Sequence, residues 1–198
     1  MEQIQIQSFG FSELYEWAEL PNDFLGRFVT FSKETPDKIT LFGANPNDVC
    51  LGVTTVNSTI DSDNPTEWHN KYKKNEFGDL FLENERLAVG TKVYDENLEL
   101  SFIRTYPWEH LIRIETEEYD NTKQFIPRTR RREWIRVNLM GKCIVVDNGE
   151  CVPGQYCTPY IGKLKSKQGT AIPATTDSVH KFYVLSRISD NTILILNK

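Results

Sequence analysis

The sequence predicts an all-β protein, β-dominated with one short N-terminal helix, that folds as a single compact domain with long irregular loops. Three observations support this class. Short segments that are apolar, or that alternate apolar and polar residues, recur along the chain between turn-forming residues. Helical periodicity is weak outside one N-terminal segment. The 198 residues, 39% hydrophobic and 12% aromatic, are enough to bury one sizeable core.

Seven segments have the length and pattern of β-strands. Two short stretches between them, Asp147 to Gly149 and Ser189 to Asn191, contain residues that tolerate the positive φ of tight turns, so we expect hairpin turns there. The predicted strands are residues 28–31, 38–42, 49–56, 98–103, 143–146, 182–188 and 192–196.

The single predicted helix covers residues 12–18. Ser12 is placed to cap it, and Glu13 and Glu16 would lie in its first turn, where the helix dipole favours negative charge. Pro21 would end it soon afterwards. Long irregular loops are expected at residues 57–72 and 106–136, and no change in composition marks a linker, so one domain is predicted for residues 1–198.

The charge balance argues against binding to nucleic acid or to anionic membranes. The net charge is −5, and both partners require a cationic face. A basic block is the one feature that could contact phosphate, but an acidic block at residues 115–121 precedes it, so pairing within or between subunits is expected. No apolar run spans a bilayer and no signal peptide is evident, so we expect synthesis in the host cytoplasm. The basic block comprises Arg128, Arg130, Arg131, Arg132 and Arg136.

No metal site and no cofactor are expected. The cysteines form no Cys-x-x-Cys pair, and the three histidines have no metal-ligand spacing, so we interpret the cysteines as small buried apolar residues. The acidic run at residues 61–64 lacks the glycine and the distal glutamate of a calcium-binding EF-hand loop and is interpreted as a polar loop. The four cysteines are Cys50, Cys143, Cys151 and Cys157.

Two carboxylates among aromatic residues at 11–18, followed by Gly-Arg-Phe-Val-Thr at 26–30, form the most informative stretch of the chain. With the later motifs, this stretch resembles the peptidase G2 or intramolecular-chaperone domain, the autoproteolytic C-terminal domain of phage tail-spike and pre-neck appendage proteins. The later motifs lie at residues 48–54, 67–72, 75–78, 125–128, 132–134, 138–142, 147–149, 154–157, 169–171 and 190–193.

The resemblance implies a domain that helps a trimeric spike to assemble and then cuts itself off at a Ser-Asp bond just before a Tyr-Ala-Glu motif. Glu13 takes the position of the catalytic acidic residue, and Ser12 and Ser8 are nearby hydroxyls. The cleavage pair falls on Phe9–Gly10, which is neither Ser nor Asp. Residues 1–9 would then be an N-terminal extension, and residues 80–123, which leave the family pattern, a divergent insertion.

These observations lead to one main hypothesis and two alternatives. The main hypothesis is a stand-alone structural or assembly subunit of a virus or phage particle, as a capsid, tail or appendage component. It would form a homotrimer, contact other virion proteins and not cleave itself efficiently. The alternatives are an active self-cleaving endopeptidase that uses Glu13, and a carbohydrate- or receptor-binding module with exposed aromatic residues. Bulky aromatic residues are expected at the subunit interface, namely Phe11, Tyr15, Trp17 and Trp134.

Overall fold

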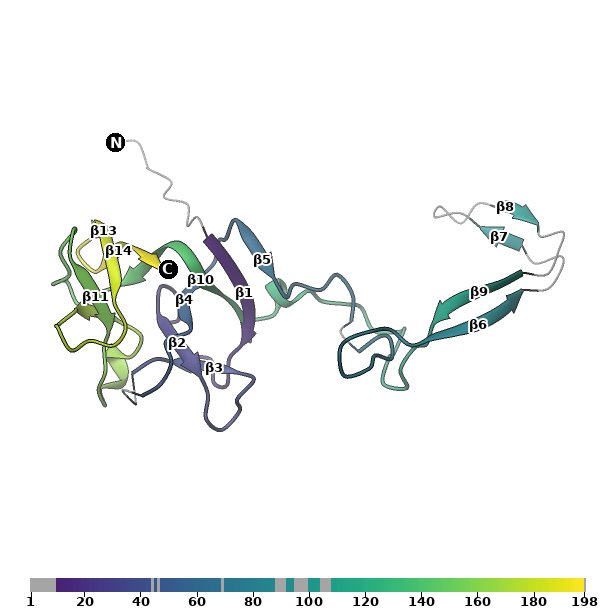
Figure 1. The fold of residues 1–198 in the computed structure, drawn as a ribbon, viewed down its shortest axis with the longest axis horizontal. Helices are drawn as coiled ribbons and strands as arrows, with labels where there is room; N and C mark the ends of the chain where they lie inside the picture. Colours follow the sequence, from purple (N-terminus) through teal and green to yellow (C-terminus); the bar gives the residue numbers. More distant parts are fainter. Residues whose placement is uncertain are drawn as a thin grey trace. The chain divides into compact units, whose positions relative to one another are not determined.

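The computed structural model describes residues 10–43, 45, 47–68, 70–87, 92–94, 100–103 and 108–197. These residues belong to two compact units (Figure 1). We call the first unit, Met1–Asn64 with Ile126–Lys198, the body, and the second, Pro65–Phe125, the arm. The composition had given no sign of this division. The predicted insertion at residues 80–123 lies inside the arm.

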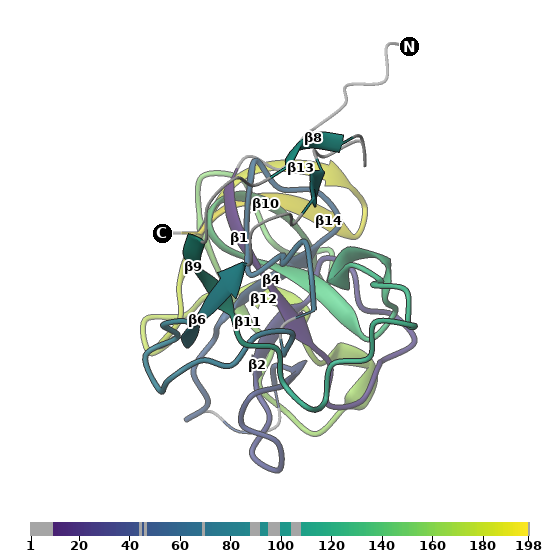
Figure 2. The same ribbon diagram turned by 90° about the vertical axis from the view of Figure 1, so that its right-hand side faces the viewer.

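The body contains one sheet of ten strands. The order across it is β12-β11-β13-β14-β10-β4-β2-β3, and β1 pairs with β10 while β5 pairs with β1. Figure 2 views the same strands from the side, with β13, β14 and β10 next to one another. The strands are β1 (Gly10–Glu16), β2 (Phe28–Phe31), β3 (Ile39–Leu41), β4 (Gly52–Thr55), β5 (Ile60–Ser62), β10 (Trp134–Val146), β11 (Tyr156–Pro159), β12 (Ala171–Pro173), β13 (Phe182–Ser189) and β14 (Thr192–Asn197).

The long strand β10 organises this sheet because its two halves have different partners. Its first half pairs antiparallel with β1 and with β4, and its second half pairs with β14. The change of partner falls near Gly141, whose φ is 106°, and the register with β1 shifts between Phe11 and Ser12. A glycine at positive φ and a bulge bend a strand, so one continuous strand can serve both parts of the sheet.

Two clusters of buried apolar side chains stabilise the body. Both draw on β10, since Val137 belongs to one and Val145 to the other. The smaller cluster is Trp17, Val29, Ile39, Ile135 and Val137, with Tyr15 and Leu139 packed against it. The larger contains Phe28, Phe42, Val53, Cys143, Val145, Cys151, Cys157, Ala171, Val184, Ile193 and Ile195.

The arm consists of two-stranded ribbons. Strand β6 (Leu82–Leu87) pairs antiparallel with β9 (Trp108–Arg113), and β7 (Lys92–Tyr94) pairs with β8 (Leu100–Ile103). None of the arm's described side chains is buried. The helical structure among the described residues is two short 3₁₀ turns of the body, η1 (Arg128–Arg130) and η2 (Lys165–Lys167), and no described helix is long and apolar enough to cross a membrane.

The β-dominated class is confirmed, and each of the seven predicted segments overlaps a strand. The turn at Ser189 to Asn191 joins β13 to β14 as predicted. The hairpin predicted at Asp147 to Gly149 is wrong: Gly149 has a φ of 89°, but the described strands on either side, β10 and β11, do not pair with each other. Instead β10 pairs with β14, which follows β11 in the sequence.

The predicted helix at residues 12–18 is also wrong, because residues 10–16 form strand β1. Alternation explains the strand: Ser12 and Leu14 are buried, whereas Phe11, Glu13 and Tyr15 are at least partly exposed. This period of two fits a strand between neighbours, and aromatic residues favour strands over helices. The pairing with β10, more than 110 residues away in sequence, decided against the local capping signal.

Candidate functional site

Strand β1 places the two main candidate groups on opposite sides of the sheet. Successive side chains of a strand point to opposite faces, so Ser12 and Glu13 diverge although they are adjacent in sequence. Ser12 faces inward and is fully buried, beside Leu14. Glu13 lies on the other face with Tyr15 and is partly exposed. The carboxylate of Glu13 is therefore badly placed to take a proton from the Ser12 hydroxyl.

Glu13 is held by Tyr15, two residues further along the same face. The Tyr15 hydroxyl donates a hydrogen bond of 2.7 Å to Oε2 of Glu13, and the Tyr15 ring packs edge-on against Phe31 at 5.8 Å. Burial, and then the hydrogen bond to the Glu13 carboxylate, raise the pKa of Tyr15 well above its usual value of 10.0. Tyr15 thus remains a protonated donor at neutral pH, and Glu13 is fixed as its acceptor.

A second group of polar residues surrounds the start of β1. Ser12 lies opposite Asn138 of β10, and both side chains are fully buried. The Ser12 hydroxyl and both polar atoms of the Asn138 amide lack a hydrogen-bond partner among the described residues. Two polar side chains therefore lie next to each other inside the body, where β1 pairs with β10. Asn138 was not among the predicted site residues; the signal available in the sequence was a single asparagine between the apolar residues Val137 and Leu139.

Gly10 lies directly against this polar pair. A Cβ at Gly10 would collide with the carbonyl oxygen of Met140 and with the side-chain amide of Asn138. The Gly10 carbonyl accepts two hydrogen bonds, from the Ser58 hydroxyl at 2.8 Å and from the Thr59 N–H at 3.1 Å. The backbone at residue 10 is therefore enclosed on both sides. The other predicted hydroxyl, Ser8, and the first residue of the expected cleavage pair, Phe9, lie outside the described residues.

The basic block does not form one cationic surface. Arg128 is buried, pairs with the Asp63 carboxylate and stacks on the Trp134 ring at 4.0 Å, with Arg131 over the same ring at 5.6 Å. Arg136 forms an ion pair of 2.8 Å with Asp61. The acidic partners of Arg128 and Arg136 thus come from residues 61–64, not from the acidic block at 115–121. The prediction of a polar loop there is partly wrong, because Asp61 and Ser62 belong to β5, which pairs with β1. Exposed Arg130 and Arg132 form no ion pair with a described residue.

The predicted interface aromatics have different environments. Trp17 is 3% exposed and belongs to the smaller core cluster of its own chain. Tyr15 packs against that cluster, and Trp134 is half-buried under its two arginines. Phe11 is 36% exposed and lies between Met140 and Ile60, which are 60% and 59% exposed. Of the four residues, Phe11 is the one that forms part of an exposed apolar patch.

The cysteines are part of the larger core cluster. Cys143, Cys151 and Cys157 are buried, and Cys50 packs against the same cluster. Burial raises the pKa of Cys50 and of Cys143 to about 12, so their thiols stay protonated at neutral pH. Among the described residues, no group of three or more His, Cys, Asp or Glu side chains could hold a metal ion.

The comparisons with known proteins agree with the fold. The model of the family described as Peptidase_G2, IMC autoproteolytic cleavage domain, matches residues 4–186. This chain belongs to the Peptidase_G2 family. No curated protein sequence gives a significant match to this member of the family.

Two solved structures of bacteriophage phi29 gene product 12 resemble this Peptidase_G2 chain. Pre-mature gene product 12 matches 97% of this chain with a TM-score of 0.64 and 20% identity. The C-terminal fragment of gene product 12 matches 95% of this chain and 99% of the fragment, with a TM-score of 0.60 and 21% identity. This chain spans 22% of the length of the pre-mature protein, so these similarities describe the fold of one part of gene product 12.

Proposed function

We propose that this chain is an assembly domain of a phage appendage, associates as a homotrimer and does not cleave itself efficiently. Membership of the Peptidase_G2 family and the fold shared with the C-terminal fragment of phage phi29 gene product 12 support a role in a virus particle. On this proposal the domain is made in the host cytoplasm, and its partners are further copies of itself and other virion proteins.

The surroundings of Gly10 carry the proposal that cleavage is inefficient. The family resemblance places an aspartate at this position, directly after the scissile bond. Here any side chain at residue 10 would meet the Met140 carbonyl and the Asn138 amide. The Met140 carbonyl is part of the backbone of β10 and cannot rotate away as a side chain could. An aspartate carboxylate that could act at the bond therefore has no room in this fold.

The remaining candidates do not replace that carboxylate. A self-cleavage reaction needs a nucleophile close to the scissile carbonyl and a base within hydrogen-bond reach of it. Ser12 is buried on the face opposite to Glu13, and Glu13 is already engaged by the Tyr15 hydroxyl. These placements support a structural use of β1, in which both residues help to set its pairing with β10.

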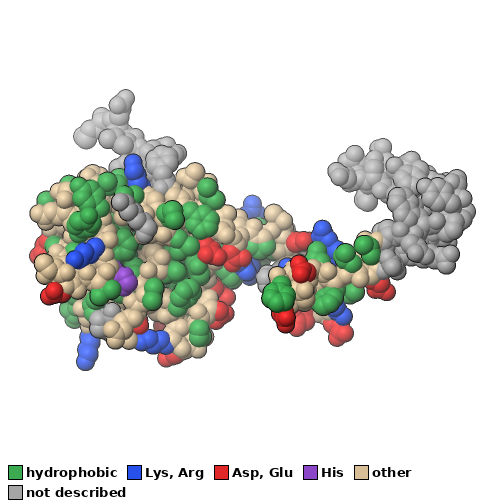
Figure 3. All heavy atoms as spheres, in the orientation of Figure 1, with side chains coloured by type: hydrophobic (Ala, Val, Ile, Leu, Met, Phe, Trp, Pro, Cys, Tyr) green, Lys and Arg blue, Asp and Glu red, His purple; other side chains and the backbone are tan. Residues whose placement is uncertain are grey.

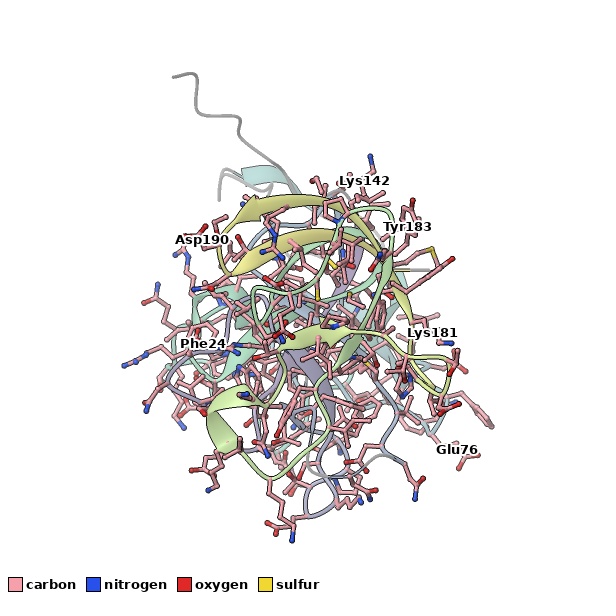
Figure 4. All side chains as sticks on the ribbon, turned by 90° about the vertical axis from the view of Figure 1, so that its left-hand side faces the viewer. Phe24, Glu76, Lys142, Lys181, Tyr183 and Asp190 are labelled. Carbon is pink, nitrogen blue, oxygen red and sulfur yellow. The ribbon has the colours of Figure 1, made fainter. Side chains whose placement is uncertain are left out.

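An exposed apolar band on the body supports self-association. It begins with Ile60, Phe11 and Met140, which are neighbours across β5, β1 and β10. On the same face the exposed Lys142 interrupts the apolar residues. Beyond it Leu196, the partner of Lys142, pairs with Tyr183, and Tyr183 packs edge-on against Tyr156 at 5.5 Å. Figure 4 shows Lys142 and Tyr183 on the same side of the body. Exposed apolar residues gathered on one face are typical of a surface that contacts another protein.

We do not propose that this chain binds nucleic acid. The body contains as many acidic as basic residues, fifteen of each, and three arginines of the basic block are engaged by aspartates or by Trp134. Two exposed arginines, Arg130 and Arg132, are too few for the phosphate contacts on which binding to nucleic acid depends.

Intact mass and light scattering on one fresh sample test the proposal. We expect a full-length chain of 23.0 kDa in a particle of about three times that mass. A chain shortened before Glu13 would contradict inefficient cleavage and support the self-cleaving alternative. In that case the Glu13→Gln variant should stay full-length if Glu13 is catalytic. The Ser12→Ala variant tests in the same way whether the Ser12 hydroxyl takes part in cleavage. A full-length monomer would contradict the homotrimer.

A further inference from the structure

The arm exposes large apolar side chains without burying any that the structure describes. Phe77 is 83% exposed, Leu111 61%, Phe81 50% and Leu82 49%. Both hydrophobic clusters of the described residues lie in the body. In Figure 3 the coloured part of the arm shows green apolar side chains between red acidic ones. The arm therefore has a regular backbone without a described core to stabilise it.

The register of the ribbon places apolar residues on both of its faces. Leu82 lies opposite Arg113, and Leu111 is two residues before Arg113, so Leu82 and Leu111 share one face. Ile112 lies opposite Glu83, and Phe81 is two residues before Glu83, so Ile112 and Phe81 share the other. A single two-stranded ribbon is at best marginally stable in water unless another surface covers it. An apolar ribbon that neither face protects needs a partner to remain ordered.

The contacts near the two chain ends of the arm do not bury the apolar residues of the ribbon. Trp68 and Phe125 pack edge-on at 5.7 Å, and Lys71 lies over the rings of Tyr72 and Tyr119 at 4.9 and 5.3 Å. These contacts close the two ends of the arm segment against each other. None of them involves the exposed leucines of β6 and β9, so they do not bury the ribbon's apolar residues.

Charge indicates what the partner is. The arm contains thirteen acidic and eight basic residues, so it carries the whole net charge of −5, while the body is neutral. The body nevertheless presents two exposed arginines, Arg130 and Arg132, that have no ion-pair partner among the described residues. The body also presents the exposed apolar band described above. A second copy of this chain therefore offers both an apolar surface and unpaired positive charge to an acidic, apolar ribbon.

We propose that the arm docks through the exposed apolar residues Phe81, Leu82 and Leu111 onto the body of a second copy of this chain. This inference rests on the proposed function, because it requires the chain to associate. It adds the arm to the predicted interface. Of the predicted aromatic residues Phe11, Tyr15, Trp17 and Trp134, it keeps Phe11, which lies in the apolar band of the body.

The test compares two substitutions that each place a lysine at an exposed aliphatic residue, one in the arm and one in the body. Leu111→Lys puts a charge on the ribbon, and Val179→Lys puts the same charge on an exposed site of the body that is 77% exposed. Light scattering over a dilution series gives the mass of wild type and both variants. We expect Leu111→Lys to shift dissociation to at least a tenfold higher concentration, and Val179→Lys to leave it unchanged. An oligomeric wild type with an unaffected Leu111→Lys variant would overturn the arm inference alone, whereas a monomeric wild type would overturn the proposed trimer as well.

Amide hydrogen exchange on the unmodified protein tests the same contact without a substitution, so a variant that fails to fold cannot affect the result. We expect the amides of β6 and β9 to be protected at high concentration and to lose that protection on dilution below the dissociation point. The amides of β10, which the body itself buries, should keep theirs. Protection of β6 and β9 that does not depend on concentration would show that the ribbon is covered within its own chain, and would overturn the proposal.

Discussion

In the body, side chains such as Phe28, Val137 and Ile195 are completely buried, whereas in the arm every described side chain keeps contact with solvent. Both units are nevertheless built from the same kind of element, the antiparallel strand pair. The comparison shows that pairing of strands does not by itself stabilise a unit. The body supplies its own apolar burial, and the arm has to obtain burial from another surface.

The largest effect that tests this contrast is the loss of a buried aromatic ring. Phe28→Ala should lower the free energy of unfolding by about 3–5 kcal/mol, because it removes a fully buried side chain from the larger cluster. Phe77→Ala in the arm should change it by less than about 0.5 kcal/mol, since that ring is 83% exposed. Urea unfolding followed by tryptophan fluorescence measures both, at a protein concentration held constant. Equal losses would mean that the arm is part of the same cooperative core.

A smaller difference is expected within the basic block. Arg128→Ala should cost about 1–3 kcal/mol, because Arg128 stacks on Trp134 and donates to the carboxylate and the backbone carbonyl of Asp63. This cost is smaller than that of breaking a fully buried ion pair, because the Asp63 side chain is 45% exposed and water screens its charge.

The matched control is Arg132→Ala, which removes an exposed arginine from the same block. It should change stability by less than about 0.5 kcal/mol. The same urea titrations give both values. If Arg132→Ala proved the more destabilising, the assignment of Arg128 as the structural member of the block would be wrong.

The smallest effect concerns the pH dependence that Tyr15 confers. The pKa of Tyr15 is raised in the folded protein. Its contribution to the free energy of unfolding is therefore fully present below the usual pKa of 10.0, and is lost as the pH rises towards the pKa of the folded state. Unfolding of wild type and of Tyr15→Phe should be compared between pH 8 and 11. The wild type should lose more stability than the variant above pH 10, and below pH 9 the variant should be weaker by about 0.5–1.5 kcal/mol because it lacks the bond to Glu13. Parallel curves for the two proteins above pH 10 would show that Tyr15 is not the group responsible.

The sequence predicted the strand segments well where apolar residues run or alternate between turn formers. It failed at residues 12–18, where a serine followed by two glutamates gave a plausible helix start. It also missed the first half of β10, because residues such as Arg136 and Asn138 interrupt the apolar pattern there. In both places the pattern is decided by a partner strand that is distant in the sequence, which local propensity does not register.

The candidate site was only partly within reach of the sequence. Glu13 and its aromatic surroundings were visible, but the hydrogen bond from Tyr15 followed only once the segment was known to be a strand, in which residues two apart share a face. The pairing of Arg128 and Arg136 with Asp63 and Asp61 was assigned to the wrong acidic segment. Nearness in sequence favoured the block at 115–121, whereas the parallel pairing of β5 with β1 brings residues 60–62 to the sheet.

The sequence by itself determined the β-rich class, the family, the net charge and the absence of the family's Ser-Asp pair at Phe9–Gly10. These follow from residue types, their order and their local spacing. The tertiary structure alone decided that Gly10 has no room for a side chain, that Ser12 and Glu13 face apart, and that the arm has no described core of its own. Each of these depends on contacts between residues that are distant in the sequence. Burial and strand pairing decide those contacts, as in the pairing of β1 with β10 across more than a hundred residues of chain.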